Sequence, residues 1–245
     1  MFNYNDFEML REIGSLSVSE IIGLIEFLSS FRSQERVEQL RKVLDRRTRY
    51  FTVLLENIDK PHNASAVIRS CECFGIQDVH LVDDAGTYDV NKKVVMGSSK
   101  WISLNKYNLE SSNVEVALKE LKRRKYRLVA TVPNDKATKL DDFDIEKGPA
   151  AFIFGTELTG VSFTVRDYAD EFVHIPMVGF TESLNISVSA AILLQNLTNK
   201  LYNSGIEWSL SDLEKNNLLL EWLRKSTPKI ESLENRYFSV DKPAV

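Results

Sequence analysis

The sequence predicts an α/β protein with a mostly parallel β-sheet and helical extensions at both ends. Between residues 51 and 175, short apolar runs alternate with amphipathic segments. Before residue 48 and after residue 185, apolar residues recur instead at helical spacing. Strands that alternate with helices form parallel sheets, because each connection must bring the chain back to the edge where the previous strand began.

The first 48 residues are expected to form a helical extension. Apolar residues there recur every three or four positions, which places them on one face of each helix. They are Ile21, Leu24, Ile25 and Leu28 in one helix and Val37, Leu40 and Leu44 in the next. Residues 49–205 are then predicted to form the main domain, and residues 206–245 a C-terminal helix and tail.

Six apolar runs are predicted to be strands, with helices between them. They are Phe51–Glu56, Val79–Val82, Trp101–Leu104, Arg127–Thr131, Ala150–Phe154 and Phe172–Ile175. A long helix is expected to follow from about Asn185 to Tyr202, and an amphipathic helix over Leu210–Leu223. The polar tail after it contains Pro and is expected to lack regular structure.

Composition excludes several classes of protein. A chain of 245 residues with 43% hydrophobic and 27% charged residues is typical of a soluble globular protein. The apolar runs are far shorter than the ~20 residues that cross a bilayer. The first residues, Met1–Glu12, lack the basic and apolar pattern of a secretion signal, so we expect a cytoplasmic protein.

The sequence also lacks the patterns of several common sites. Cys71 and Cys73 have no companion pair of Cys or His, which argues against a zinc site or a disulfide framework, and both are expected to be buried packing residues. No metal is expected. There is no G-x-G-x-x-G after a strand, no P-loop, no HExxH and no nucleophile elbow. Dinucleotide enzymes, NTPases and ordinary hydrolases are therefore disfavoured.

Positive charge is concentrated in two places, although the net charge is −4. The segment Arg32–Tyr50 carries seven basic residues against three acidic ones. The second cluster comprises Lys119, Lys122, Arg123, Arg124, Lys125 and Arg127. Basic helical faces are usually only solvated surface, so these clusters alone leave RNA binding open.

Three polar segments follow predicted strands, where ligands of parallel α/β sheets bind. In the first, Pro61 suits the start of a helix and Asn63 a helix cap, with Arg69 as an incidental surface residue. The alternative is functional, because Asn63 and Arg69 on one helix would be roughly 9 Å apart along its axis and could reach a common site.

The second and third segments are equally open to two interpretations. Gly155 and Gly160 bracket a loop, and a tight turn explains both glycines but not the carboxylate of Glu157. After Ile175–Pro176, Ser183 and Asn185 could be ordinary caps of the next helix. The small residues that follow Asn185 would also let another chain segment pack closely.

Taken in order, the three segments resemble the signature motifs of the SpoU/TrmH branch of the SPOUT RNA 2′-O-methyltransferases. The similar residues are Val53–Asn57 with Lys60–Asn63, Ser65–Ala66, Arg69 and Gly75; Gly155–Glu157 with Gly160–Ser162; and Ile175–Met177 with Ser183–Asn185 and Ser187–Val188. The resemblance implies a deep trefoil knot in the C-terminal half, S-adenosylmethionine as cofactor and a homodimer. It also implies transfer of a methyl group to a ribose 2′-hydroxyl, in the TrmH branch that of guanosine 18 in the tRNA D loop.

The resemblance also assigns roles to individual positions. By position, it implies cofactor contacts from Thr131, Gly155, Ile175, Met177, Ser183 and Leu184. It implies catalytic or positioning roles for Arg69, Asn63, Glu157, Ser183 and Asn185. It implies RNA contacts from Arg41, Arg46, Arg47 and Arg49, from His62, and from Lys100 in a loop over Gly97–Trp101.

This sequence departs from the family pattern at a few positions. Glu182 stands where a glutamine is usual, Phe180–Thr181 replaces a common Met-Val pair, and Asp59 replaces a frequent histidine. None of these changes removes a catalytic residue. Two other functions stay open: a SpoU-branch enzyme that acts on rRNA or on another tRNA position, and a non-catalytic RNA-binding paralogue.

Overall fold

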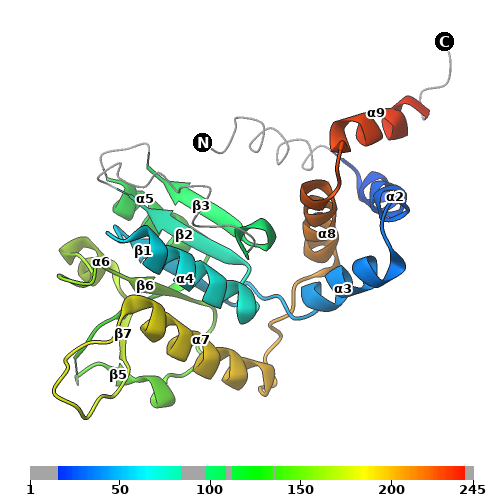
Figure 1. The fold of residues 1–245 in the computed structure, drawn as a ribbon. Coiled ribbons are helices and arrows are strands. Elements are labelled where there is room, and N and C mark those ends of the chain that lie inside the picture. The colour runs from blue at the N-terminus through cyan, green and yellow to red at the C-terminus, as the bar shows by residue number, and fades with distance from the viewer. Residues whose placement is uncertain (1–15, 84–97, 109–111, 135, 241–245) are drawn as a thin grey trace. The chain divides into compact units, whose positions relative to one another are not determined.

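The computed structural model describes residues 16–83, 98–108, 112–134 and 136–240. These residues form two compact units, one over residues 48–208 and one that combines residues up to 47 with those from 209 onward. Figure 1 shows the course of the chain through both units. No helix in the described residues is long and apolar enough to span a bilayer.

The larger unit is built on a parallel sheet of seven strands in its described residues, in the order β3-β2-β1-β6-β4-β7-β5. Every neighbouring pair is parallel. The strands are β1 (Phe51–Glu56), β2 (Asp78–Val82), β3 (Ser103–Tyr107), β4 (Arg127–Thr131), β5 (Thr138–Lys139), β6 (Ala150–Phe154) and β7 (Glu171–His174). The chain moves outward through β2 and β3 and then crosses to the other side of β1. The strand order thus reverses beside β1, where ligands of such sheets bind.

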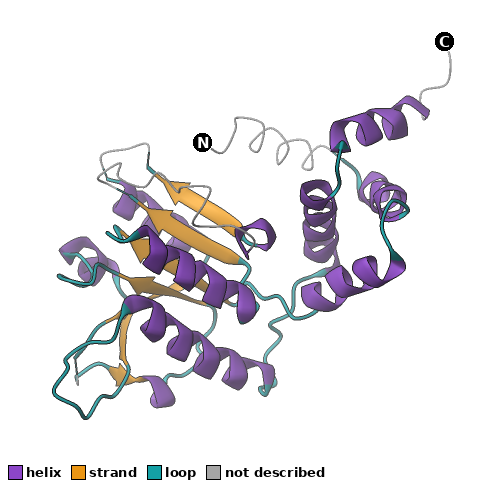
Figure 2. Cartoon of the chain, viewed as in Figure 1, coloured by secondary structure: helices purple, strands orange, loops and turns teal. Residues whose placement is uncertain are grey.

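Helices cover both faces of this sheet (Figures 1 and 2). One core contains Val53 and Phe152 together with apolar side chains of α4 (Pro61–Cys73) and α7 (Ile186–Tyr202). The other contains Leu54 and Ile153 with side chains of α5 (Asn113–Arg123) and α6 (Phe163–Tyr168). Successive side chains of a strand point to opposite faces, so a strand buried on both faces is apolar throughout, as β1 and β6 largely are.

Three of the six predicted strands have the bounds that the structure shows, whereas β2 and β7 begin one residue earlier than predicted. β1, β4 and β6 begin and end at the predicted residues. The prediction over Trp101–Leu104 is wrong, because Ser98–Trp101 forms a 3-10 helix and β3 begins only at Ser103. β3 is a half-buried edge strand, so its side chains include Asn105 and Lys106 and its apolar pattern is weak. The two-residue strand β5, exposed at Thr138 and Lys139, has no apolar pattern at all.

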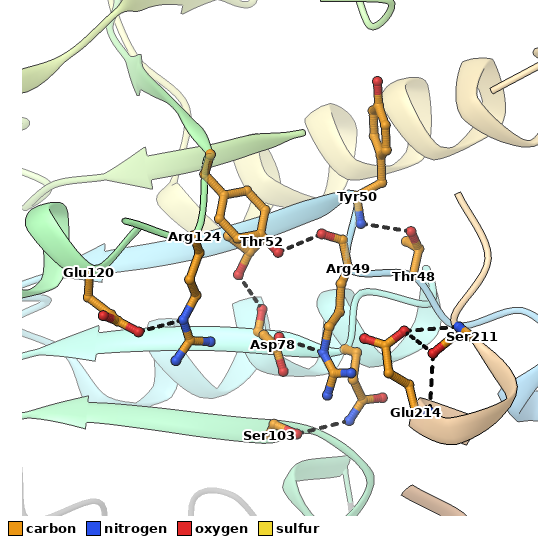
Figure 3. A network of polar contacts seen from close by, with 12 residues as sticks. Thr48, Arg49, Tyr50, Thr52, Asp78, Ser103, Glu120, Arg124, Ser211 and Glu214 are labelled. Carbon is orange, nitrogen blue, oxygen red and sulfur yellow. Dashed lines mark hydrogen bonds and ion pairs between the residues drawn. The ribbon is translucent and has the colours of Figure 1, made fainter. Parts of the chain in front are cut away.

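The smaller unit is helical. Its described residues form α2 (Val18–Ser29), α3 (Gln34–Leu44), α8 (Asp212–Ser226) and α9 (Ile230–Val240). Capping boxes begin α2 at Ser17 and α8 at Ser211; the second, formed with Glu214, is drawn in Figure 3. Both α2 and α3 pack on α8. The N-terminal and C-terminal segments therefore share one unit.

The tail after α8 is not irregular, contrary to our expectation. Residues Ile230–Val240 form α9, which packs on α2. The ring of Tyr237 lies 5.2 Å from that of Phe27, between ring centroids. A contact between residues this far apart in sequence stabilises a helix that local polarity does not predict.

The two cysteines differ in burial. Cys71 is buried in the core, as predicted, but Cys73 is exposed, so the prediction for Cys73 is wrong. Both lie in α4, where residues two positions apart point to nearly opposite sides of the helix.

A candidate active site at the carboxyl edge of the sheet

A cavity of about 320 Å³ lies where β4, β6 and β7 end. Its walls come from three connections, which follow β4 at Thr131, β6 at Phe154 and β7 at His174. The first turns of α7 close it through Ile186 and Ser189. All of the residues predicted to contact a cofactor line this cavity: Thr131, Gly155, Ile175, Met177, Ser183 and Leu184.

Gly155 is required by the close return of its own loop. A Cβ atom built on Gly155 would lie 2.1 Å from the carbonyl oxygen of Gly160. The loop is closed by two backbone hydrogen bonds between Thr156 and Gly160, of 3.1 and 3.0 Å between nitrogen and oxygen. Gly160 itself has φ +70°, in the left-handed region that glycine adopts without strain. The wall formed by this loop is therefore rigid and short.

Asn63, Glu157 and Asn185 connect the three predicted segments. The Asn63 side chain is 2% exposed and donates a hydrogen bond from Nδ2 to the Glu157 carboxylate. Asn185 donates from Nδ2 to Asn63 Oδ1 at 3.4 Å. Residues 63, 157 and 185 thus meet at one point beside the cavity, which Glu157 also lines.

The structure shows which of Asn63 and Asn185 is a helix cap. Asn63 does not cap α4, because the N-cap is Lys60 without a side-chain hydrogen bond and Pro61 opens the helix. Asn185 does cap α7, since its Oδ1 accepts from the Ser187 backbone N–H at 2.9 Å. Asn185 therefore combines the cap with the contact to Asn63.

The remaining predicted catalytic residues have accessible side chains. Arg69 lies on α4, less than two turns after Asn63, and is exposed, as is His62 at the start of the same helix. Ser183 is exposed and lines the cavity. The exposed position of Arg69 leaves its guanidinium accessible to a large substrate.

A buried carboxylate that we did not single out supports the same loop. Glu56, the last residue of β1, is 2% exposed and accepts a hydrogen bond from the Ser162 backbone N–H at 2.9 Å. The Ser162 hydroxyl in turn accepts from Val165 N–H at 3.2 Å and caps α6. A glutamate at the end of a largely apolar strand was the signal in the sequence. Arg166 and His174 also line the cavity and were not predicted.

The predicted RNA-binding arginines differ sharply in accessibility. Arg41 and Arg46 are exposed. Arg47 is 1% exposed, and its guanidinium carbon lies 5.4 Å from the ring centroid of Trp222. The prediction that Arg47 contacts RNA is therefore corrected: its guanidinium is buried in the helical core, where a contact with an aromatic face is favourable.

Arg49 and Lys100 also have partners within the larger unit. Arg49 Nε pairs with Asp78 Oδ2 at 2.9 Å, and the backbone oxygen of Asp78 accepts from the Thr52 hydroxyl, as Figure 3 shows. This pair lies at the amino edge of β1 and β2, opposite the cavity. Lys100 is exposed and its Nζ lies 5.5 Å from the Trp101 ring centroid. Gly97, in the same predicted loop, lies outside the described residues.

The second basic cluster is partly neutralised by acids. Arg123 and Arg124 on α5 both pair with Glu120 at 2.7 Å. The hydrogen bonds from Arg123 and then Arg124 lower the pKa of the Glu120 carboxyl to about 2. Lys122 pairs with Asp170 at 3.1 Å. The excess positive charge of this surface is therefore smaller than the number of its basic residues suggests. Among the described residues, no group of three His, Cys, Asp or Glu side chains is arranged to hold a metal ion.

The fold and the cavity place the chain among parallel α/β proteins with a small-molecule site at the carboxyl edge of the sheet, here at the ends of β4, β6 and β7. The chain belongs to the SpoU rRNA Methylase family, whose model matches residues 50–195. It is 41% identical over 216 residues to the tRNA (guanosine(18)-2′-O)-methyltransferase of Borreliella burgdorferi, a match that covers 88% of this chain and 97% of the relative.

Two further relatives agree with this family assignment. The tRNA (guanosine(18)-2′-O)-methyltransferase of Thermus thermophilus is 34% identical over 79% of this chain and 98% of its own length. The crystal structure of the A. aeolicus TrmH/SpoU tRNA modifying enzyme superposes with a TM-score of 0.69 at 29% identity. That superposition covers 80% of this chain and 98% of the A. aeolicus chain.

Proposed function

We propose that this protein transfers a methyl group from S-adenosylmethionine to the ribose 2′-hydroxyl of guanosine 18 in tRNA. The observation that carries the proposal is the meeting of Asn63, Glu157 and Asn185 beside the cavity. Relatives that are 41% and 34% identical to this chain are named for this reaction. The family assignment supports the methyl donor.

The cavity suits S-adenosylmethionine in size and chemistry. A volume of about 320 Å³ lies at the lower end of small-molecule sites. Ile175, Met177 and Leu184 offer an apolar wall for an adenine ring, and the bare backbone at Gly155 allows close approach. When bound, S-adenosylmethionine supplies an electrophilic methyl group on a sulfonium.

The side chains of this protein would hold the ribose 2′-hydroxyl in line with the methyl group and stabilise the negative charge that develops on its oxygen. We assign Arg69 the role of a planar fork that orients a phosphate and the 2′-oxygen and stabilises developing negative charge. A guanidinium is a poor base, because it stays protonated throughout the accessible pH range. Asn63, Glu157, Ser183 and Asn185 would position the reacting groups, and the reaction needs no metal.

RNA contacts are proposed for the exposed basic side chains. These are Arg41, Arg46, His62 and Lys100. Arg47 is left out because it is buried, and Arg49 because it pairs with Asp78. Salt-sensitive binding is the expected signature of such contacts.

Two features of the family are proposed for this chain on indirect grounds. A deep trefoil knot is supported by the strand order, since β7 lies between β4 and β5 although both precede it in the chain. A homodimer is supported by Val188 and Ile192, which are 45% and 40% exposed on α7. Apolar side chains on one helix face favour contact with a second copy. We place the activity in the cytoplasm, where tRNA is modified.

The test is methyl transfer to defined RNA. The protein is incubated with labelled S-adenosylmethionine and unmodified tRNA, and the 2′-O-methyl group is mapped by nuclease digestion. A tRNA with 2′-deoxyguanosine at position 18 is the matched control, because it lacks only the acceptor oxygen. Label on both the unmodified tRNA and the 2′-deoxyguanosine tRNA would show that the methylated nucleoside lies elsewhere in tRNA. Label on rRNA fragments alone would favour an enzyme that acts on rRNA. The absence of label on tRNA and rRNA would favour a non-catalytic RNA-binding protein.

A further inference from the structure

Three charged side chains line the cavity, and the proposed reaction uses only one of them, Glu157. Glu157, Arg166 and Glu182 all line it. Glu157 is already held by the Asn63 amide. Arg166 and Glu182 are therefore the charged groups of the described cavity wall whose task is unexplained.

Arg166 reaches the cavity from α6. The helix is anchored by Val165, which is fully buried, and capped by Ser162. Arg166 is exposed, and the one hydrogen bond of its side chain within the described residues is a long contact of 3.4 Å from Nε to the carbonyl oxygen of Val161. Because this contact uses only Nε, the terminal nitrogens of the guanidinium form no hydrogen bond within the described residues.

Glu182 reaches the same cavity from a different connection, between β7 and α7. It is exposed and is followed directly by Ser183 and Leu184, which also line the cavity. Within the described residues, neither Glu182 nor Arg166 forms an ion pair. Basic side chains of α5 behave differently, since Arg123 and Arg124 both pair with Glu120.

The charges of the cavity complement those of the proposed cofactor. S-adenosylmethionine carries an ammonium, a sulfonium and a carboxylate, which are two positive groups and one negative group. The three residues above provide two carboxylates and one guanidinium. Guanidinium forks bind carboxylates through two parallel hydrogen bonds, and a carboxylate accepts from an ammonium.

We propose that Arg166 and Glu182 together recognise the amino-acid end of the cofactor, with Arg166 on its carboxylate and Glu182 on its ammonium. The inference rests on the proposed function, because it takes S-adenosylmethionine as the ligand. It deepens that function by assigning cofactor specificity to two residues from separate elements, Arg166 of α6 and Glu182 of the connection between β7 and α7.

Binding calorimetry with the reaction product S-adenosylhomocysteine and two related ligands tests the assignment without requiring activity. S-adenosylhomocysteine has the amino-acid end, 5′-methylthioadenosine lacks it, and decarboxylated S-adenosylhomocysteine keeps only the ammonium. For Arg166→Gln we expect a roughly tenfold loss of affinity for S-adenosylhomocysteine and no loss for the other two ligands. Glu182→Gln is expected to weaken both ligands that contain the ammonium and to leave 5′-methylthioadenosine unchanged.

Two further variants make the result specific. Arg166→Lys keeps the charge but not the fork, so it should retain part of the affinity. Arg123→Gln, on the exposed face of α5, is the control and should bind all three ligands as the wild type does. Equal weakening of all three ligands in Arg166→Gln and Glu182→Gln, or no weakening, would overturn the assignment while the proposed function stands. Failure of the wild type to bind any of the three would overturn the proposed function itself and this assignment with it.

Discussion

The side-chain amide of Asn63 donates a hydrogen bond to the carboxylate of Glu157, joining the first turn of α4 to the loop after β6. The two residues are 94 positions apart in the chain. Asn63 is almost completely buried, whereas Glu157 is exposed, so the contact lies at the boundary between the protein interior and the solvent. A hydrogen bond between a helix and a loop sets the relative position of the groups that each of them presents.

Asn63→Asp is expected to be more harmful than Asn63→Ala, because it places two carboxylates in contact. We expect the aspartate variant to lose about 1–3 kcal/mol of unfolding free energy at pH 7 and most of its methyl transfer. Urea unfolding and single-turnover transfer measure the two effects. Adding Glu157→Gln should recover part of the stability of Asn63→Asp. Identical stability of the single and double variants would show that the two side chains do not interact.

Gly155→Ala is expected to abolish cofactor binding. Its Cβ would clash with the Gly160 carbonyl and open the loop that forms the cavity wall. We expect a cost of about 1–3 kcal/mol or more from the displaced backbone. Gly179→Ala is the matched control, since a Cβ there meets nothing within 4 Å. Calorimetry with S-adenosylhomocysteine should separate the two variants, and equal affinities would contradict the close approach.

Arg69→Ala is expected to stop transfer and to spare the cofactor. The proposed fork acts on the RNA and on charge that develops during transfer, so we expect the rate to fall by about 100-fold to 1000-fold. Affinity for S-adenosylhomocysteine should stay within about threefold of the wild type, because Arg69 does not line the cavity. Arg69→Lys should recover little, since it lacks the planar fork. A matching loss of cofactor affinity would refute this role.

Stability is expected to decrease as the pH falls, because of His80. Burial lowers the pKa of His80 to about 3, with a smaller contribution from Arg124, while Glu120 raises it. In the unfolded chain His80 is protonated below about pH 6.5, whereas in the folded chain it is protonated only below about pH 3. Between these values the free energy of unfolding should decrease by up to roughly 1.4 kcal/mol per pH unit from this residue.

His80→Gln provides the comparison, because glutamine can still contact the Tyr107 hydroxyl, which lies 3.0 Å from His80 Nδ1. The variant should be less stable than the wild type at about pH 7.5, and the difference should shrink as the pH falls to about 4. Urea unfolding across this pH range measures it. Parallel curves for the two proteins would contradict the lowered pKa.

Arg47 and its exposed neighbours are expected to have separable roles. Arg47→Ala should destabilise the helical unit by roughly 2–4 kcal/mol, because it empties a buried site over Trp222. Arg41→Ala with Arg46→Ala should leave the melting temperature unchanged. It should weaken tRNA binding and lower the salt slope by about one for each lost phosphate contact. An unchanged salt slope would show that this surface does not touch RNA.

The sequence alone was sufficient for the class of fold and for the segments of the site. Strands β1, β4 and β6 are buried on both faces, so their apolar runs stand out and their bounds are predicted to the residue. The residues predicted to contact a cofactor lie at the ends of β4 and β6 or in the motif after β7. Any parallel sheet brings such positions to one edge.

Tertiary structure decided the features that depend on contacts between distant residues. Local sequence could not show whether Asn63 caps a helix or contacts Glu157, because Glu157 lies 94 positions further along the chain. Arg47 belongs to a basic run, yet it is buried because Trp222 in α8 provides its aromatic partner. The helix α9 forms in a polar tail because the ring of Tyr237 packs on that of Phe27 in α2. The periodicity of the sequence shows which face of a helix or strand is apolar. Which other element packs on that face is known only from the folded structure.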